Sequence, residues 1–532
     1  MSKTNILFSS IIKSISYCSK SSENSLKERY LFKLFANFIG LAFGIIIQVI
    51  IPRGLGPKSY GDFNFLSTFF TQAVSFFDMG TSTCFYTKLS QRPKESSLVS
   101  FYLFYFTGFI SILMILFVAI ADSLSFKTKL WPDQEASYIY MGAAFGIIAW
   151  ITTVLGQIAD AYGITVTAEI VRIVQKVVSL FVIMSLYLFY QLNLETFFYY
   201  NYLMFFFLCI AFIWAIIHKG YSLKLNWKLS TEHIKKYIEE FYHYSHPLFL
   251  YALVGLIAGI LDRWLLQVFA GSLQQGFYSL SYQIGAVCFL FTSAMTPLLM
   301  REFSIAFGNK DLGKMAYLFR RYVPMLYFIA AYFACFIAFQ AEKVIYIFGG
   351  NKYKEAAMAV TIMAFFPIHQ TYGQLGSSEF YATGQTRLQR NIGVLFMLIG
   401  LPVTYFLIAP VDRWGLNARA TGLAIKMVTL QFIGVNVQLY FNARYLKFSF
   451  WKYLGHQIFV IVCLLVIATG ATIAGNKILT IWGSENVVSG FLFSGVLYTL
   501  MVITLIYFLP IFMGLKKQDI QSLAHKMRKY IK

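Results

Sequence analysis

The sequence predicts an all-α integral membrane protein, and its composition and hydrophobic pattern carry this prediction. Of the 532 residues, 58% are hydrophobic and only 13% are charged, whereas soluble chains are about half apolar and a quarter charged. Aromatic residues alone make up 19% of the chain. Long apolar runs recur from one end of the chain to the other, so lipid must be the solvent for most of this surface.

Fourteen membrane-spanning helices are expected. A helix needs about 20 apolar residues to cross the roughly 30 Å hydrocarbon layer of a bilayer. The sequence contains fourteen such runs, each bounded by charged residues, Gly or Pro. Their expected limits are 31–52, 63–87, 98–121, 137–160, 164–190, 195–218, 247–270, 275–300, 322–340, 356–380, 389–410, 415–442, 450–475 and 486–513.

The distribution of Lys and Arg predicts that both termini are cytoplasmic. With the N-terminus placed inside, the inner segments carry 29 basic residues and the outer loops carry 10. Cytoplasmic loops are enriched in Lys and Arg, so this bias predicts a multi-pass protein of the inner (cytoplasmic) membrane. It also accounts for the net charge of +21 without a nucleic-acid partner, because basic loops contact anionic membrane lipids.

An internal repeat predicts two related halves. Residues 56–63 read GPKSYGDF and residues 271–278 read GSLQQGFY, so both follow G-x-x-x-x-G-x-aromatic at an offset of 215. Glycine permits a tight turn with positive φ. The repeat falls where six spans per half would place it, and transporters are often built from two such halves with the substrate site between them. We therefore expect two six-helix bundles around a central cavity, followed by two extra C-terminal helices.

The expected domains follow the spans in order. A cytoplasmic N-terminal tail (1–30), without a cleaved signal peptide, precedes the N-terminal six-helix bundle (31–218). A cytoplasmic linker (219–246) leads to the C-terminal six-helix bundle (247–442), and its segment after Ser230 has the period of an interfacial amphipathic helix. Two additional transmembrane helices (443–513) and a basic cytoplasmic C-terminal tail (514–532) complete the chain.

Four short segments resemble one family of membrane proteins. Residues 53–61 read RGLGPKSYG, which is similar to the R-x-L-G-P-x-x-Y-G segment after the first span of Wzx-type polysaccharide flippases. Further matches to that family are Leu261-Asp262-Arg263 followed by Gly271 and Gly276-Phe277-Tyr278-Ser279, Ile347-Phe348-Gly349 with Tyr353, and Ala382-Thr383-Gly384-Gln385. Together they extend the resemblance over residues 31–442.

The resemblance implies a function as well as a fold. It places the chain in the MOP superfamily, which also holds the MATE multidrug exporters and the lipid II flippase. It implies a central cavity that opens alternately to each side of the membrane. The implied substrate is an oligosaccharide joined by pyrophosphate to a polyprenyl lipid, as in O-antigen, capsule and lipopolysaccharide biosynthesis. A polysaccharide polymerase and its chain-length machinery would then be partners.

Charged residues deep in the spans are the candidate binding site. In span five, Glu169, Arg172 and Lys176 occupy positions i, i+3 and i+7 of one helical face. A charge at a helix centre costs roughly 2.5–3.5 kcal/mol on insertion scales, so such residues serve a cavity or a partner. We expect Arg172 and Lys176 to bind the substrate pyrophosphate in a cationic cavity. The alternative for Arg172 is an intrahelical ion pair with Glu169.

The remaining polar residues inside the spans complete two sets of candidates. For Asp262 and Arg263, the alternative to a transport role is an ion pair with each other. For His369 and Gln370 of span ten, the alternative to substrate binding is hydrogen bonding between helices. The substrate-binding candidates are Arg172, Lys176, Lys426, Arg263, His369 and Gln370, and the coupling or ion-pair candidates are Asp78, Asp160, Glu169 and Asp262.

Transport of this kind needs no covalent chemistry, and we expect no catalytic residue, cofactor or metal. The sequence has no P-loop, no H-E-x-x-H, no G-x-S-x-G and no dinucleotide fingerprint, and its six cysteines lack metal-ligand spacing. A proton or sodium ion could still drive transport. Two other functions stay open: a MATE-type cation-coupled multidrug exporter, and a membrane polysaccharide polymerase or glycosyltransferase, which would need larger outer loops than this chain has.

Overall fold

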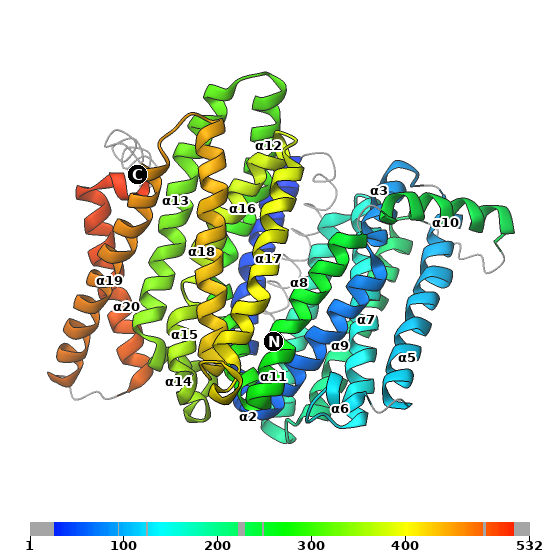
Figure 1. Cartoon of the computed structure of the whole chain (residues 1–532), viewed down its shortest axis with the longest axis horizontal. Helices are drawn as coiled ribbons and strands as arrows, with labels where there is room; N and C mark the ends of the chain where they lie inside the picture. Colours follow the sequence, from blue (N-terminus) through cyan, green and yellow to red (C-terminus); the bar gives the residue numbers. More distant parts are fainter. Residues whose placement is uncertain are drawn as a thin grey trace, which may run out of the picture. The chain divides into compact units, whose positions relative to one another are not determined.

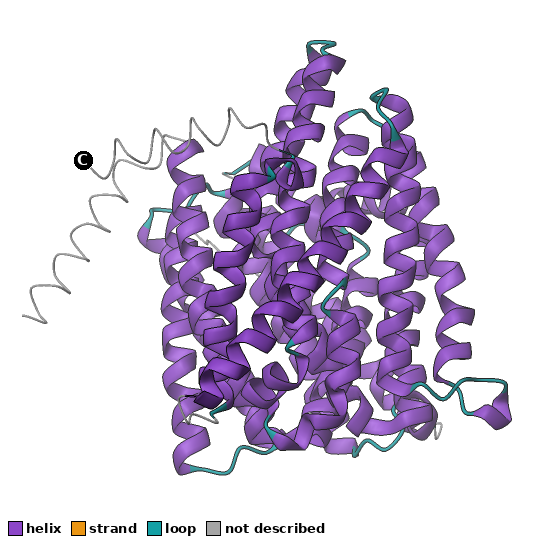
Figure 2. Ribbon diagram, turned by 90° about the vertical axis from the view of Figure 1, so that its left-hand side faces the viewer, coloured by secondary structure: helices purple, strands orange, loops and turns teal. Residues whose placement is uncertain are grey.

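The computed structural model describes residues 26–93, 95–123, 126–221, 229–246, 249–481 and 486–514. Every regular element in these ranges is a helix (Figure 2). Within the described ranges, ten helices are long and apolar enough to cross a membrane. The all-α integral membrane class is therefore confirmed. Most of the expected N-terminal tail and nearly all of the expected C-terminal tail lie outside the described residues.

The fourteen expected spans all fall on helices, but not all on uninterrupted ones. The ten helices that qualify by length and apolarity cover ten of them. The others, 31–52, 63–87, 275–300 and 356–380, fall on helices that are kinked, short or more polar. A backbone polar group in hydrocarbon must be satisfied within the protein, so the breaks in these helices require protein or water around them.

Contacts divide the chain into two compact units. The first comprises Met1–Leu55 and Asp62–Trp264, and the second comprises Gly56–Gly61 and Leu265–Lys532. The chain is divided inside two long helices, α2 (Leu26–Asp78) and α11 (Phe249–Ala286). The bundle boundaries expected from the sequence, at residues 218 and 247, stay a prediction.

Besides parts of α2 and α11, the first unit contains all the helices that lie between them in the sequence. In order they are α3 (Thr81–Gln91), α4 (Ser96–Ser100), the π-helical η2 (Phe101–Phe106), α5 (Thr107–Ser123), α6 (Lys127–Leu130), α7 (Ala136–Ala161), α8 (Thr165–Phe189), α9 (Leu194–His218) and α10 (Thr231–Ser245). Helix α7 packs on α9 and α3, and α8 packs on α9. Helix α7 also packs closely on α2. Gly142 and Gly146 of α7 allow this contact, because a Cβ on either would press on Phe70 of α2.

Helix α10 is the amphipathic segment expected after Ser230. It lies across the ends of the first unit's long helices (Figure 1) and packs on α3. Ser230 caps its N-terminus by accepting a hydrogen bond from the His233 N–H. Tyr237 and Phe241 are buried, whereas Ile238 is 56% exposed.

The second unit has a core between long helices and a pair of C-terminal helices beside it. Its helices are η4 (Val287–Phe289), α12 (Leu290–Gly308), α13 (Leu312–Phe339), α14 (Ala341–Gly349), η5 (Asn351–Ala356), α15 (Ala357–Met363), α16 (Phe366–Ala382), α17 (Thr386–Ile408), η6 (Val411–Arg413), α18 (Arg419–Tyr445), α19 (Phe450–Ile481), α20 (Val487–Phe508) and η7 (Pro510–Met513). Helix α16 packs on α12, α13 and α18, and α19 packs on both α13 and α20. Tyr498 of α20 stacks on Tyr332 of α13.

The first glycine of each repeat interrupts a helix. Gly56 and Gly271 have positive φ, 73° and 75°, and non-helical backbone, so each separates two helical stretches that share the single label α2 or α11. The second glycine of each motif serves close packing within the second unit. A Cβ on Gly61 would overlap the carbonyl oxygen of Ser272, and one on Gly276 would overlap that of Pro57. The positive φ expected from the motif is present, but only at the first glycine.

Candidate functional site

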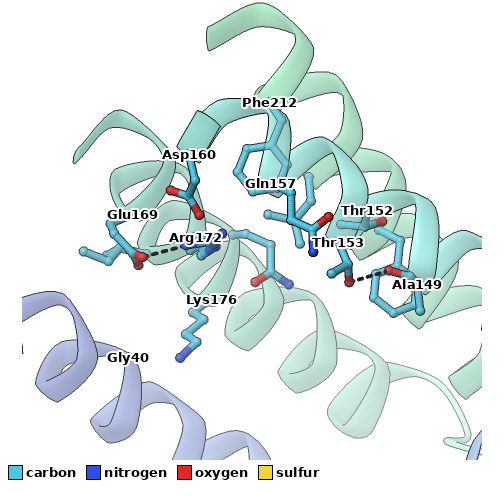
Figure 3. Close-up of a pocket in the computed structure, with 15 residues that line it drawn as sticks. Gly40, Ala149, Thr152, Thr153, Gln157, Asp160, Glu169, Arg172, Lys176 and Phe212 are labelled. Carbon is cyan, nitrogen blue, oxygen red and sulfur yellow. Dashed lines mark hydrogen bonds and ion pairs between the residues drawn. The ribbon is translucent and has the colours of Figure 1, made fainter. Parts of the chain in front are cut away.

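The polar face of α8 lines a cavity of the first unit. Glu169, Arg172 and Lys176 all border it, as expected from their spacing. The cavity has a volume of about 500 Å³ and is enclosed by α2, α7, α8 and α9 (Figure 3). Ligand pockets of drug-sized molecules have volumes of about 300–1,000 Å³, so this cavity has room for a polar group of several rings.

Arg172 is held by an ion pair and an aromatic ring. Its Nη1 lies 2.6 Å from Oε1 of Glu169, and its guanidinium lies 5.6 Å from the ring centroid of Phe212. The Glu169 side chain is 8% exposed and that of Arg172 is 36% exposed. Gly156 of α7 makes room for the guanidinium, because a Cβ there would lie 3.1 Å from Nη2. The intrahelical ion pair that the spacing allowed is therefore present, and the arginine still borders the cavity.

Lys176 extends across the cavity toward α2 (Figure 3). Among the described residues, no carboxylate lies within ion-pair distance of its ammonium group. Gly40 of α2 leaves the space for it, since a Cβ on Gly40 would lie 2.5 Å from Nζ. A lysine within a span is costly unless it faces water or a ligand, so the cavity explains its presence.

Acceptor groups balance these cations. Asp160 of α7 borders the same cavity, and its Oδ1 is buried without a hydrogen-bond partner in the described part of the chain; the same holds for Oε1 of Gln157. The lining thus has two acidic and two basic side chains, not an excess of positive charge. Uncharged residues that the sequence did not single out complete it: Thr152, Thr153, Gln157, Gln175, Phe205 and Phe212.

Three of the polar candidates belong to the second unit. Lys426 of α18 is 9% exposed and packs against α17, where a Cβ on Gly400 would lie 3.1 Å from its Cε. His369 is 5% exposed and meets the ring of Phe432 edge-on. Gln370 accepts a hydrogen bond from Nε2 of Gln431. None of these three candidates borders the α8 cavity.

The three remaining candidates, Asp78, Asp262 and Arg263, lie on other helices. The Asp78 carboxylate accepts hydrogen bonds from the Thr81 hydroxyl at 2.8 Å, the Ser82 hydroxyl at 2.7 Å and the Tyr102 hydroxyl at 3.0 Å, and from the Ser82 N–H at 3.0 Å. It therefore stabilises the start of α3. Asp262 and Arg263 are half-buried on α11 and do not border the α8 cavity.

A buried acid that the sequence reading did not select lies near the C-terminal end of α16. Glu379 is fully buried, and neither of its carboxyl oxygens has a hydrogen-bond partner among the described residues. The sequence feature that could have indicated this residue is its position in the polar segment GQLGSSEF of an otherwise apolar span.

Solved structures with this fold are membrane transporters. An inward-facing multidrug resistance MATE family transporter of the MOP superfamily is 14% identical, with a TM-score of 0.61 over 79% of this chain and 99% of that one. The lipid II flippase MurJ in an inward closed conformation is 11% identical, with a TM-score of 0.63 over 90% and 98%. A MOP superfamily transporter from Pyrococcus furiosus is 14% identical, with a TM-score of 0.52 over 80% and 97%.

These likenesses establish the fold, and the sequence establishes the family. No curated protein sequence matches the chain. The model of the family described as polysaccharide biosynthesis protein matches residues 28–300, which is just over half of the chain. The chain therefore belongs to the polysaccharide biosynthesis protein family and has the fold of the MOP superfamily transporters.

Proposed function

We propose that this protein translocates a polyprenyl-pyrophosphate-linked oligosaccharide across the cytoplasmic membrane, for a cell-surface polysaccharide such as O-antigen or capsule. The observation that carries the proposal is the α8 cavity, which places cations, unpartnered acceptors and aromatic rings inside a lipid-embedded bundle. A family of polysaccharide biosynthesis and a fold shared with a lipid II flippase support it.

The chemical problem of such transport is to carry a pyrophosphate and sugars through hydrocarbon while the lipid tail stays in the bilayer. The ammonium group of Lys176 and the guanidinium of Arg172 supply charge-assisted donors for phosphate oxygens. Sugar hydroxyls would donate to the unpartnered oxygens of Asp160 and Gln157. The half-buried ring of Phe205 offers an apolar face to a sugar ring. No bond is made or broken, so binding and release suffice.

Transport further requires that the cavity open in turn to each side of the membrane. We propose that alternating access of this kind moves the head group, with both termini on the cytoplasmic side. Lys426, Arg263, His369 and Gln370 stay proposed contacts for other stages of the passage. Polysaccharide polymerase and chain-length proteins are proposed partners on the outer side, because they would consume the translocated lipid.

The direct test replaces Lys176 by Gln, which keeps a polar, flexible side chain and removes its charge. We expect loss of surface polysaccharide at unchanged protein level, because the ammonium group has no other partner in the described part of the chain. Lys236→Gln is the matched control, since Lys236 is exposed on α10. Normal export by each of Lys176→Ala, Arg172→Ala and Lys426→Ala would exclude a role for these cations in head-group binding.

The second candidate function is a cation-coupled exporter of the MATE type. The observation that favours it is the pair of acids, Asp160 and Glu169, in the cavity lining, because organic cations bind to carboxylates. A deletion strain would then become sensitive to cationic drugs while its surface polysaccharide stayed normal. Loss of polysaccharide with unchanged drug sensitivity would support the flippase instead.

A further inference from the structure

A row of polar side chains runs between α16 and α18, inside the second unit. We call it the α16–α18 seam: Gln370 and Glu379 of α16 with Gln431, Gln438 and Asn442 of α18. The three α18 residues are spaced i, i+7 and i+11, which places them on one face of that helix. Gln431 donates to Oε1 of Gln370, and Gln438 donates to Oε1 of Gln389 on α17 at 3.3 Å.

Two glycines of α16 make room for these amides. A Cβ on Gly373 would lie 3.2 Å from Nε2 of Gln431, and one on Gly376 would lie 2.9 Å from Nδ2 of Asn442. That same Nδ2 donates to the Gly376 carbonyl at 3.3 Å. The seam is therefore a built feature of the contact between the two helices, since α16 has no side chain where the amides approach it.

Glu379 closes the seam at the end that faces the cytoplasm in the proposed orientation. It follows Gly376 by three residues, so the two lie on the same side of α16. Tyr445, three residues after Asn442 on α18, interacts electrostatically with Glu379. Glu379 is fully buried, and both of its oxygens lack a partner in the described ranges.

The charges around Glu379 do not neutralise a carboxylate there. Four arginines at this end of the helices packed on α16 are exposed: Arg301 of α12, Arg320 of α13, Arg387 of α17 and Arg444 of α18. Arg321 of α13 is half-buried and donates a hydrogen bond to the Tyr317 hydroxyl at 2.7 Å. None of them forms a described ion pair with Glu379. An ionised carboxylate buried without a partner is strongly unfavourable, so Glu379 carries a proton in this conformation.

The seam also has more acceptors than donors. Oε1 of Gln438 and Oδ1 of Asn442 are buried without partners in the described structure, as are both oxygens of Glu379. A protonated carboxyl supplies one O–H donor. Buried water satisfies such leftover groups in proteins, and a file of waters along amides is a route by which a proton can travel.

We propose that Glu379 is a proton-binding site of the transport cycle, reached through the α16–α18 seam. In the releasing step its O–H bond breaks, the proton passes to water at the cytoplasmic end, and a carboxylate remains. A proton arriving along the seam from the middle of the membrane restores the acid. This inference rests on the proposed transport function, but the protonation of Glu379 can be measured without any substrate.

The first experiment measures that protonation in the full-length protein. Infrared absorption of the protein in liposomes at neutral pH should show a protonated-carboxyl band that Glu379→Gln removes. Glu355→Gln is the matched control, because Glu355 is an exposed acid of the same unit, and it should leave the band unchanged. A band that survives in Glu379→Gln would overturn the proposal.

The second experiment ties the proton to export. A protonophore should reduce surface polysaccharide in cells with the Glu355→Gln protein. Cells with Glu379→Gln should export less and should no longer respond to the protonophore. Glu379→Asp keeps a carboxyl group and should restore the band and part of the export, which separates loss of the proton site from misfolding.

Two outcomes would count against the proposal while leaving the flippase function intact. In one, Glu379→Gln exports normally with unchanged protonophore sensitivity, and Glu379 is then a static buried acid. In the other, the export that depends on Glu379 follows a sodium gradient and ignores the protonophore. Normal export by the Lys176, Arg172 and Lys426 variants would instead contradict the proposed head-group binding and would leave the infrared result standing.

Discussion

At the scale of single residues, the cavity separates two cations that look equivalent in the sequence. Arg172 is largely neutralised by Glu169 within the same helix, at 2.6 Å. Lys176, one turn further along α8, has no such partner among the described residues. An anionic ligand would have to compete with Glu169 for Arg172, whereas it could bind Lys176 without breaking an ion pair among the described residues. Lys176 is therefore the residue on which anion binding depends most.

The space around Lys176 gives a prediction at this scale. In Gly40→Ala the new Cβ would press on the ammonium group, which can swing away at little cost because it is the end of a flexible side chain. We expect folding to be unaffected, since Ala favours helix over Gly by about 1 kcal/mol, and export to fall because the lysine is displaced. Gly44→Ala, one turn along α2, meets nothing within 4 Å and is the control. Equal export by the two variants would mean that the position of Lys176 does not matter.

At the scale of elements, α10 is docked on α3 by a small network of charges and hydroxyls. Glu240 pairs with Lys88 at 2.7 Å and with Arg92 at 3.0 Å. The Tyr237 hydroxyl donates to Glu95 at 2.6 Å, and burial, with this hydrogen bond, raises the pKa of Tyr237 to about 12. The amphipathic helix is thus bound to its own protein by polar contacts as well as by its buried aromatic side chains.

The docking of α10 should weaken in acid. Burial alone would raise the pKa of Glu240, but hydrogen bonds from Lys88 and Arg92 outweigh it and lower the pKa below the ordinary 4.5. A lowered pKa in the folded state means that the carboxylate stabilises the docked helix above about pH 4.5. This stabilisation, about 1 kcal/mol for a partly exposed network, is lost as the pH falls through the folded value.

Hydrogen exchange of the α10 amides, measured at stepwise lower pH, would check this. Protection should drop below about pH 4.5, and Glu240→Gln should show the low protection already at neutral pH. Glu239→Gln is the control, because Glu239 is exposed beside it on the same helix. If both variants kept the wild-type pH profile, the salt bridges would not hold α10 in place.

At the scale of the whole molecule, the sequence predicts the positions of the helices well and the contacts between helices poorly. Hydropathy places every expected span on a helix, and the i, i+3, i+7 spacing brings Glu169, Arg172 and Lys176 to one cavity, because both depend on local geometry. Contacts between helices are not local. Neither spacing nor composition indicates that Asp160 and Gln157 border the same cavity, or that Lys426 packs against Gly400 in the other unit.

The buried Glu379 was missed for the same reason. From the sequence alone it is an acid near the end of a span, where a solvated position is the simpler expectation. Its burial results from α12, α13 and α18, which pack on α16. The amide spacing of Gln431, Gln438 and Asn442 was a usable signal, because polar residues on one face of an apolar helix require partners.

The glycine repeat gives the last prediction, which concerns how the chain is held together. Gly61 approaches the Ser272 carbonyl, and Gly276 approaches that of Pro57. The repeat offset of 215 relates Gly61 to Gly276 and Pro57 to Ser272. The two contacts are thus reciprocal halves of one crossing. A Cβ at either glycine overlaps backbone rather than a mobile side chain, so Gly61→Ala and Gly276→Ala should each destabilise the protein by about 3 kcal/mol or more.

Because the two glycines share one crossing, the double variant should lose less stability than the sum of the single losses. Thermal unfolding of the detergent-solubilised protein measures all three variants. Gly255→Ala, on the same helix as Gly276, meets nothing within 4 Å and should unfold at or above the wild-type temperature. If Gly276→Ala unfolded like Gly255→Ala, the backbones would have room to separate, and the second glycine of the repeat would not be needed for packing.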